Sequence, residues 1–386
     1  MKIIASAVSL LVSLSSCNAE ASLLRAAIST DDSPTIINLS QDIPRDESAI
    51  SSSPGAKAVQ EAASQDPLIR NVMVLENGSI VSSYTRHDVD PSKPFDVMSV
   101  TKSWMSLLFG MLVDDGLLSL DETLGDIFPD VTAWADVTDG SIDFRKGATI
   151  KELLTYTSGF FDKFEMLFGP EPGGQSLQGS LSYPLIGVKG EWAYLAMSQI
   201  HSYIIQERTG MTPRQYLAEN MMGKLGIGED EYDWTQNSDE IEFGGTHLIL
   251  TPMQMAKFGQ LYLQGGRINP SNDDRLISEK WIDASFTHHA TTDITWGGEY
   301  PYGYCFTGLY KHPSGSIVYC ALGGFNDNVI CVDRELGRVI IVQRESSFEN
   351  RPDLKVLGLF VDSNLSFRDP IVGLSGVKST VESRTE

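Results

Sequence analysis

A serine and a lysine three positions apart are the residues in this sequence whose spacing points most directly to chemistry. They are Ser99 and Lys102, in the run Ser99-Val100-Thr101-Lys102. Side chains three apart lie on one side of a helix, so the lysine amine can approach the serine hydroxyl. A serine hydroxyl is a weak nucleophile near neutral pH and needs a base within hydrogen-bond distance. The pair therefore predicts acyl transfer, with Ser99 attacking a carbonyl carbon and Lys102 accepting its proton.

A helix is predicted to carry this pair, from Ser99 to Gly116. Apolar side chains recur along it at helical spacing: Trp104, Leu107, Leu108, Met111 and Leu112. The first turn of a helix offers unpaired N–H groups and partial positive charge, which favour the oxyanion formed in acyl transfer. A lysine acts as a base only in its neutral form, which burial or a cationic neighbour favours. Taken alone the spacing is weak, because a helix start with a solvated lysine gives the same pattern.

Further stretches accompany the Ser99–Lys102 run: 114–122, Phe128-Pro129, 148–159, Thr209-Gly210, 225–227, Gly244-Gly245 and 251–255. Together they resemble the β-lactamase-related serine hydrolases, which include class C β-lactamases, D-Ala-D-Ala peptidases, family VIII esterases and aminohexanoate-dimer hydrolases. The resemblance covers roughly residues 68–350. It implies a β-lactamase/transpeptidase-like α/β (α+β) fold, in which helices flank an antiparallel sheet and one helical segment is inserted. It also implies a two-step acyl transfer without a cofactor.

The family's second element is a tyrosine before a long helix, which moves protons between serine, lysine and leaving group. The resemblance assigns this role to Tyr194. The family usually has asparagine two positions later, where this chain has Ala196. That asparagine amide helps to hold the substrate amide in β-lactam and peptide processing, so its loss favours an esterase or an unusual amidase. The alternative for Tyr194 is a core aromatic residue that anchors the helix.

The family's third element, Lys-Thr-Gly or His-x-Gly on a strand, matches Leu322-Gly323-Gly324 by position. Glycines let a substrate carbonyl approach the strand backbone closely. The resemblance implies that the N–H groups of Phe325 and Ser99 form the oxyanion hole. No basic or hydroxyl side chain stands at the first two positions, which weakens carboxylate recognition. A simple strand turn is the alternative.

The elements that position these residues follow from hydrophobic periodicity. The segment 71–82 predicts a hairpin around Asn77-Gly78. We expect it to join the late strands in one antiparallel sheet with helices packed on it. A long loop over the site is expected at 160–190. Helices are predicted at 149–155, 196–209, 212–222 and 251–263, and strands at 304–309, 317–322, 328–333 and 339–344.

Composition divides the chain into four parts. Residues 1–21 are typical of a signal peptide, with one early lysine and an uncharged apolar run too short to span a bilayer. A flexible leader is predicted at 22–67, with one short helix near 56–63. The catalytic domain is predicted at 68–369 and a loose tail at 370–386. We therefore expect a secreted or extracytoplasmic protein.

Cysteine and asparagine patterns bear on that compartment. Cys17 follows a run similar to a bacterial lipoprotein box, so a lipid anchor there is the second possibility if the source is bacterial. Of the other three cysteines at most two can pair with each other, and three buried thiols are equally compatible with the pattern. These cysteines are Cys305, Cys320 and Cys331. Glycosylation acceptor sequences begin at Asn38, Asn77 and Asn364, and they matter only in a eukaryotic protein.

Charge and missing motifs exclude other classes. The formal net charge of −22 argues against nucleic acid or an anionic membrane as the main partner. The six histidines lack paired-ligand spacing, so no metal site is expected. There is no Gly-x-Ser-x-Gly, phosphate loop or dinucleotide fingerprint, and no further segment is long enough to span a membrane.

The sequence thus predicts a secreted serine hydrolase that cleaves a small-molecule ester or amide through Ser99, without cofactor or metal. An esterase is favoured over a β-lactamase. Two alternatives remain open: a non-catalytic binding protein that kept the fold, and a peptidase acting on D-amino-acid or cell-wall peptides. The oligomeric state is not predicted.

Overall fold

The computed structural model describes a set of ranges that together make up most of the chain. Those described residues that follow Pro34 belong to one compact unit. The predicted signal peptide with Cys17, the sequence at Asn364, Gly324, Phe325 and the tail beyond residue 370 lie outside the described residues. The described ranges are 34–130, 132, 134, 141–160, 176–182, 187–194, 198–271, 274–292, 299–312, 314–323, 328–345 and 369–370.

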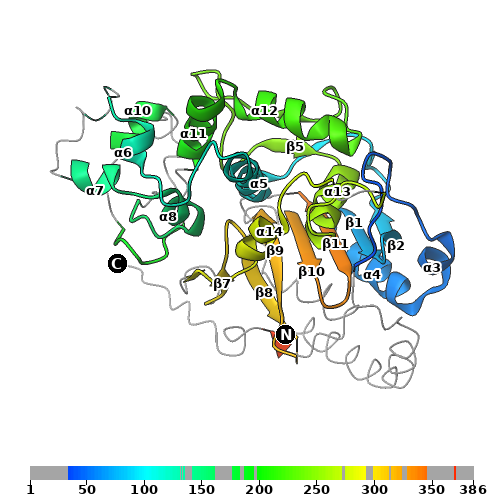
Figure 1. Cartoon of the computed structure of the whole chain (residues 1–386). Helices are drawn as coiled ribbons and strands as arrows, with labels where there is room; N and C mark the ends of the chain where they lie inside the picture. Colours follow the sequence, from blue (N-terminus) through cyan, green and yellow to red (C-terminus); the bar gives the residue numbers. More distant parts are fainter. Residues whose placement is uncertain are drawn as a thin grey trace, which may run out of the picture. The chain divides into compact units, whose positions relative to one another are not determined.

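An antiparallel sheet forms the centre of this unit (Figure 1). Its strands lie in the order β2-β1-β11-β10-β9-β8-β7-β6, and β12 pairs with β8. The first strand pairs with the last long one, Val72 opposite Val342, which confirms the predicted union of the early hairpin with the late strands. The strands are β1 (Ile69–Glu76), β2 (Ser79–Thr85), β6 (Ala290–Thr291), β7 (Pro301–Tyr302), β8 (Thr307–Lys311), β9 (Ile317–Gly323), β10 (Asn328–Asp333), β11 (Arg338–Arg344) and β12 (Asp369–Pro370).

The sheet is covered on both faces, because its residues alternate between two apolar clusters. On what we call the outer face, side chains such as Val74 and Val329 belong to one cluster with Val59 and Ala63 of helix α4 (Pro54–Gln65), which packs on β1 and β2. On the inner face, side chains such as Leu75 and Ile330 pack with helix α13 (Pro252–Leu263). Burial on both faces explains why the late strands read as nearly continuous apolar runs.

Residues 35–67 differ from the predicted flexible leader. They contain α3 (Glu47–Ser52) and α4, and Val59 and Ala63 of α4 are fully buried on the sheet. Ser53 caps α4 and Pro54 stands in its first turn, which is a favourable helix start. The short helix predicted near 56–63 is therefore longer and is part of the core. Its small apolar side chains gave a weak signal among serines and alanines.

The other helices largely follow the predictions. The capping boxes that begin α8 (Ile150–Thr155), α12 (Pro213–Asn220) and α13 are each a threonine with a Glu or Gln three residues later. Helix α11 (Gln199–Thr209) ends at Gly210, which has a positive φ of 71°. Other short helices were not predicted from the sequence: α6 (Leu124–Ile127), α7 (Ile142–Lys146), α10 (Leu177–Ser182), α14 (Glu279–Ser285) and the 3₁₀ turn η3 (Met222–Leu225).

Two predictions need correction. The loop expected at 160–190 contains the helix α10 within its described part. The strand expected at 304–309 begins only at Thr307, because Cys305 has a positive φ of 61° that interrupts the extended backbone.

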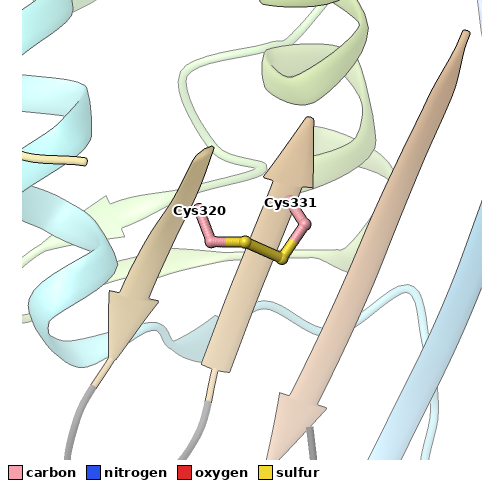
Figure 2. Close-up of a disulfide and its surroundings, with 2 residues drawn as sticks. All are labelled: Cys320 and Cys331. Atoms are coloured by element: carbon pink, nitrogen blue, oxygen red, sulfur yellow. A yellow bond between two sulfur atoms is a disulfide. The ribbon is translucent and has the colours of Figure 1, made fainter. Parts of the chain in front are cut away.

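One disulfide joins two neighbouring strands of the sheet. Cys320 on β9 stands directly opposite Cys331 on β10, and their sulfur atoms are bonded (Figure 2). Both side chains belong to the outer-face cluster. Cys305 is a free, buried thiol. Of the alternatives open at the sequence level, the structure therefore has one bridge and one thiol.

Candidate active site

Ser99 lies in a 3₁₀ turn, η1 (Met98–Val100), that leads directly into helix α5 (Thr101–Asp114). The helix proper thus begins two residues later than predicted. The side chains of Ser99 and Lys102 are both buried, with 6% and 4% of each residue exposed. Helix α5 is buried along most of its length, so the pair is held against the core rather than on a solvated surface.

The structure brings the three predicted catalytic side chains together. The Lys102 Nζ atom lies 3.3 Å from the Ser99 Oγ atom. The Tyr194 hydroxyl lies 2.9 Å from the same Oγ atom. The Lys102 amine also lies 4.9 Å from the centre of the Tyr194 ring. One hydroxyl is therefore within hydrogen-bond distance of an amine and a phenol, which is the arrangement that activation of a serine requires.

Backbone from a distant part of the chain fixes the lysine. Lys102 Nζ donates a 2.7 Å hydrogen bond to the carbonyl oxygen of Gly245. A Cβ atom at Gly245 would lie 2.8 Å from Nζ, and one at Gly244 would overlap the carbonyl group of Ser198. The glycine pair is therefore needed for this close approach, a role that the sequence signalled only through the resemblance.

Tyr194 stands in a group of aromatic rings. Its ring meets that of Tyr156 edge to face at 5.5 Å, and Trp192 lies 6.2 Å away. Burial raises the pKa of the Tyr156 phenol well above its usual value, so Tyr156 stays protonated. Tyr194 is only partly buried. Of these two tyrosines, Tyr194 is thus the one placed to exchange protons at Ser99.

Two other titratable groups near the site are held neutral. His201 on α11 is fully buried, and within the described part of the chain neither of its ring nitrogens has a hydrogen-bond partner. Burial, with the nearby Lys102 charge, lowers the pKa of His201 to about 3. Burial raises the pKa of the Cys305 thiol to about 12, which makes it a poor rival nucleophile.

The predicted third element lies beside the serine turn as far as it is described. Strand β9 contacts η1 and ends at Gly323, which pairs with Asn328 of β10. The Asn328 amide donates a 2.9 Å hydrogen bond to the carbonyl oxygen of Asp96. Because Gly324 and Phe325 lie outside the described residues, the oxyanion hole remains a prediction.

Two residues beside the serine turn, Asp96 and His247, were not predicted from the sequence. The Asp96 carboxylate accepts a 2.7 Å hydrogen bond from the N–H of Met98, the residue before Ser99. Its other oxygen lies 2.6 Å from Nδ1 of His247. The one available signal was an aspartate two positions before Met98, a spacing typical of a turn. Elsewhere, the described ranges contain no group of three metal-ligating side chains and no helix fit to cross a membrane.

Comparisons with known proteins identify the family of the chain. The family model described as Beta-lactamase matches residues 61–361. Monacolin J acid methylbutanoyltransferase of Aspergillus terreus is 28% identical over 163 residues, which are 38% of this chain and 40% of that protein. The 6-aminohexanoate-dimer hydrolase of Paenarthrobacter ureafaciens is 24% identical over 260 residues, or 60% and 61%. The match thus spans less than two thirds of either relative.

Solved structures share the fold. EstCE1, a hydrolase with promiscuous acyltransferase activity, superposes with a TM-score of 0.64 at 14% identity, over 80% of this chain and 98% of its own. A penicillin-binding protein homologue from Caulobacter crescentus gives 0.61 at 16% identity, over 80% and 96%. These likenesses confirm the predicted β-lactamase/transpeptidase-like fold. Since the family model matches most of the chain, the protein belongs to the β-lactamase family.

Proposed function

We propose that the protein is a serine hydrolase or acyltransferase that forms an acyl-enzyme on Ser99 and prefers esters to β-lactams. The observation that carries this proposal is the position of the Ser99 hydroxyl, within hydrogen-bond distance of both Lys102 Nζ and the Tyr194 hydroxyl. Members of the family act as serine hydrolases or acyltransferases, which agrees with that geometry.

The proposed reaction requires the Lys102 amine to be neutral at the moment when it accepts the Ser99 proton. A neutral amine has two N–H donors and one lone pair, so it can donate to the Gly245 carbonyl and still accept the Ser99 proton. As Oγ bonds to the carbonyl carbon, its proton passes to Lys102. The backbone N–H of Ser99, with that of Phe325 as predicted, stabilises the oxyanion.

Collapse of the tetrahedral intermediate breaks the bond to the leaving group. Tyr194 donates its proton to the leaving oxygen or nitrogen, and the Lys102 ammonium returns a proton to the phenolate. Water then attacks the acyl-enzyme, with the same groups acting in reverse, and releases the acid. An alcohol in place of water gives acyl transfer instead.

Ester substrates are favoured for a chemical reason. Ala196 stands where the family usually has an amide side chain that holds a substrate amide, and an ester offers no N–H to be held. The transferase from Aspergillus terreus, by its name, moves a methylbutanoyl group, and EstCE1 is described as a hydrolase with acyltransferase activity. Both support acyl transfer from an ester-like donor.

We also propose that the protein works outside the reducing cytosol, as its first 21 residues predict. The Cys320–Cys331 disulfide supports this, because disulfides persist in oxidising compartments. Asn38 and Asn77, which begin two acceptor sequences, are exposed. In a eukaryotic host, an enzyme that removes N-linked glycans should lower the mass of the secreted protein.

The test is covalent labelling with a fluorophosphonate probe, followed by a panel of short-chain p-nitrophenyl esters. We expect labelling and ester turnover by the natural protein and neither by a folded Ser99→Ala variant. Labelling that survives Ser99→Ala would discard the assignment, and an unlabelled natural protein would favour the non-catalytic alternative. Adding an alcohol acceptor separates transfer from hydrolysis, and turnover of D-Ala-D-Ala peptides faster than esters would favour the peptidase alternative.

A further inference from the structure

One short segment of the chain contacts the serine turn at both of its ends. We call residues 245–248 the clamp segment and residues 96–102 the nucleophile turn. The clamp contacts the turn through side chains and through backbone, and every contact joins positions more than 140 apart in sequence. Three of these contacts start from Gly245, Thr246 and His247: Lys102 Nζ to the Gly245 carbonyl at 2.7 Å, Thr246 Oγ1 to Met98 Sδ at 3.8 Å and His247 Nδ1 to Asp96 Oδ2 at 2.6 Å. Two more involve the backbone of Leu248: its N–H to Thr101 Oγ1 at 3.1 Å, and the Val97 N–H to its carbonyl at 2.9 Å.

The nucleophile turn needs such support because its backbone is strained. Met98 has a φ of 50°, in the left-handed region that a residue with a bulky side chain adopts only at a cost in free energy. The Asp96 carboxylate offsets that cost by accepting the Met98 N–H, and the Thr101 hydroxyl donates to the Met98 carbonyl at 2.6 Å. Both ends of the Met98 peptide are therefore held, and this conformation sets the direction of the next side chain, Ser99.

His247 contacts the second oxygen of the same carboxylate. A carboxylate only accepts hydrogen bonds, so the His247 nitrogen that faces Asp96 must carry the proton. His247 itself has a φ of 64°, and its ring packs edge to face against Phe243 at 5.4 Å. Two strained residues, Met98 and His247, are thus joined through one carboxylate.

We propose that His247 is a positioning residue for acyl transfer. Its Nδ1–H holds the Asp96 carboxylate on the Met98 N–H, and this keeps the Ser99 hydroxyl within reach of Lys102 and Tyr194. The inference rests on the proposed function, since it concerns the rate at which Ser99 is acylated. It requires no contact between His247 and the substrate.

The test compares two replacements of similar size at position 247. His247→Asn keeps an N–H donor at the place of Nδ1, and asparagine tolerates a positive φ; His247→Leu removes the donor. The readouts are the second-order rate of fluorophosphonate labelling at Ser99, kcat and KM for a p-nitrophenyl ester, and the thermal midpoint. We expect His247→Leu to lower labelling and kcat roughly 10- to 100-fold with little change in KM, because a small displacement of a reacting group has that effect. His247→Asn should restore most of the rate.

His289→Leu is the matched control. His289 is also partly buried, but its ring stacks on Tyr304 and its Nε2 contacts the carbonyl of Ala284. Its loss should leave the labelling rate unchanged. Equal rates for His247→Leu, His247→Asn and the natural protein would overturn the proposal, as would slow labelling that both variants share.

A second variant decides the case if His247→Leu does not fold. Asp96→Asn keeps the size of the side chain but weakens both hydrogen bonds, so it should slow labelling as His247→Leu does. Where both fold, combining them should cost little more than either alone. Undiminished labelling of Asp96→Asn would contradict the proposal. Failure of the proposed function looks different, because the natural protein itself would then remain unlabelled.

Discussion

The two faces of the central sheet are both buried, yet they carry different kinds of residue. The outer face, under α4, holds mostly apolar side chains and the Cys320–Cys331 disulfide, with the buried carboxylate of Asp333 at the end of one strand. The inner side, where α5, α11 and α13 pack, also buries polar groups such as Ser99, Lys102 and His201. The difference indicates that stability and chemistry are divided between the two sides. Substitutions on the outer face should therefore change mainly stability, whereas substitutions of the polar groups on the inner side should change mainly the reaction rate.

Buried polar groups lower stability unless they are partnered. Lys102 is partnered by the Gly245 carbonyl, whereas His201 is buried without a hydrogen bond among the described residues. The inner side thus retains groups that a purely structural core would not need. The outer face is mainly apolar, and it excludes water from one side of the strands.

The largest effect is expected on the inner side, from Lys102→Met. Methionine replaces the amine but keeps the length of the side chain, so the proton acceptor for Ser99 is lost. Loss of a general base lowers rates by about 10²- to 10⁴-fold. We expect labelling of Ser99 to fall within that range while the thermal midpoint stays equal or rises, since a buried polar head is removed. A large fall in the midpoint would show that Lys102 is mainly structural.

On the outer face the largest effect should come from the disulfide. Replacing both Cys320 and Cys331 by alanine frees a loop with a sequence separation of 11. By the chain-entropy relation this should lower the free energy of unfolding by about 3 kcal/mol. Urea unfolding measures the loss, and Cys305→Ala serves as the control that leaves the bridge intact. The labelling rate of the folded variant should be unchanged. A slower rate would show that the outer face also affects the reaction at Ser99.

The sequence predicted those parts of the molecule that depend on neighbours along the chain. The Ser99–Lys102 spacing, the helix predicted at 149–155 and the Asn77-Gly78 hairpin are local patterns, and the structure has each of them. Tyr194 was identified through the resemblance, and its hydroxyl does lie beside Ser99. Its catalytic role remains a prediction.

The remainder depends on contacts that no local pattern encodes. Asp96 and His247 are 151 positions apart, and Lys102 and Gly245 are 143 apart. Only the fold brings such pairs together. Helix α4 was predicted too short and outside the core for a related reason, because its small side chains are recognised as core residues only once the sheet beneath them is known.

The stability of the fold in acid should depend on His201, which lies on the inner side. Its folded pKa of about 3 lies below the unfolded value of 6.5, so the stability it contributes is present above pH 6.5 and is lost as the pH falls towards 3. The loss amounts to about 1.4 kcal/mol per pH unit for one proton, or about 2 kcal/mol at pH 5. His201→Leu should therefore unfold at a lower pH than the natural protein. Identical acid-unfolding midpoints would show that His201 takes up no proton when the protein unfolds.

The smallest expected effect concerns a buried charge that alternation places on the side of the sheet that bears Cys331. The Asp333 carboxylate accepts hydrogen bonds from His312 Nε2 at 3.0 Å and from the N–H groups of Glu335 and Leu336. Burial raises its pKa above the usual value, although His312 opposes that shift. A raised folded pKa means that the stability this group contributes is present at low pH and is lost as the pH rises through it.

Asp333→Asn tests this sign. The amide oxygen can keep the two backbone N–H donors, and the amide N–H₂ can donate to the His312 ring, so the contacts survive while the charge is removed. We expect the variant to gain stability relative to the natural protein as the pH rises from 3 to 7, by no more than about 1 kcal/mol. Urea unfolding at several pH values measures the difference. A relative loss over the same range would mean that the charged pair with His312 stabilises the fold, and the outer side would then also depend on a buried ionic contact.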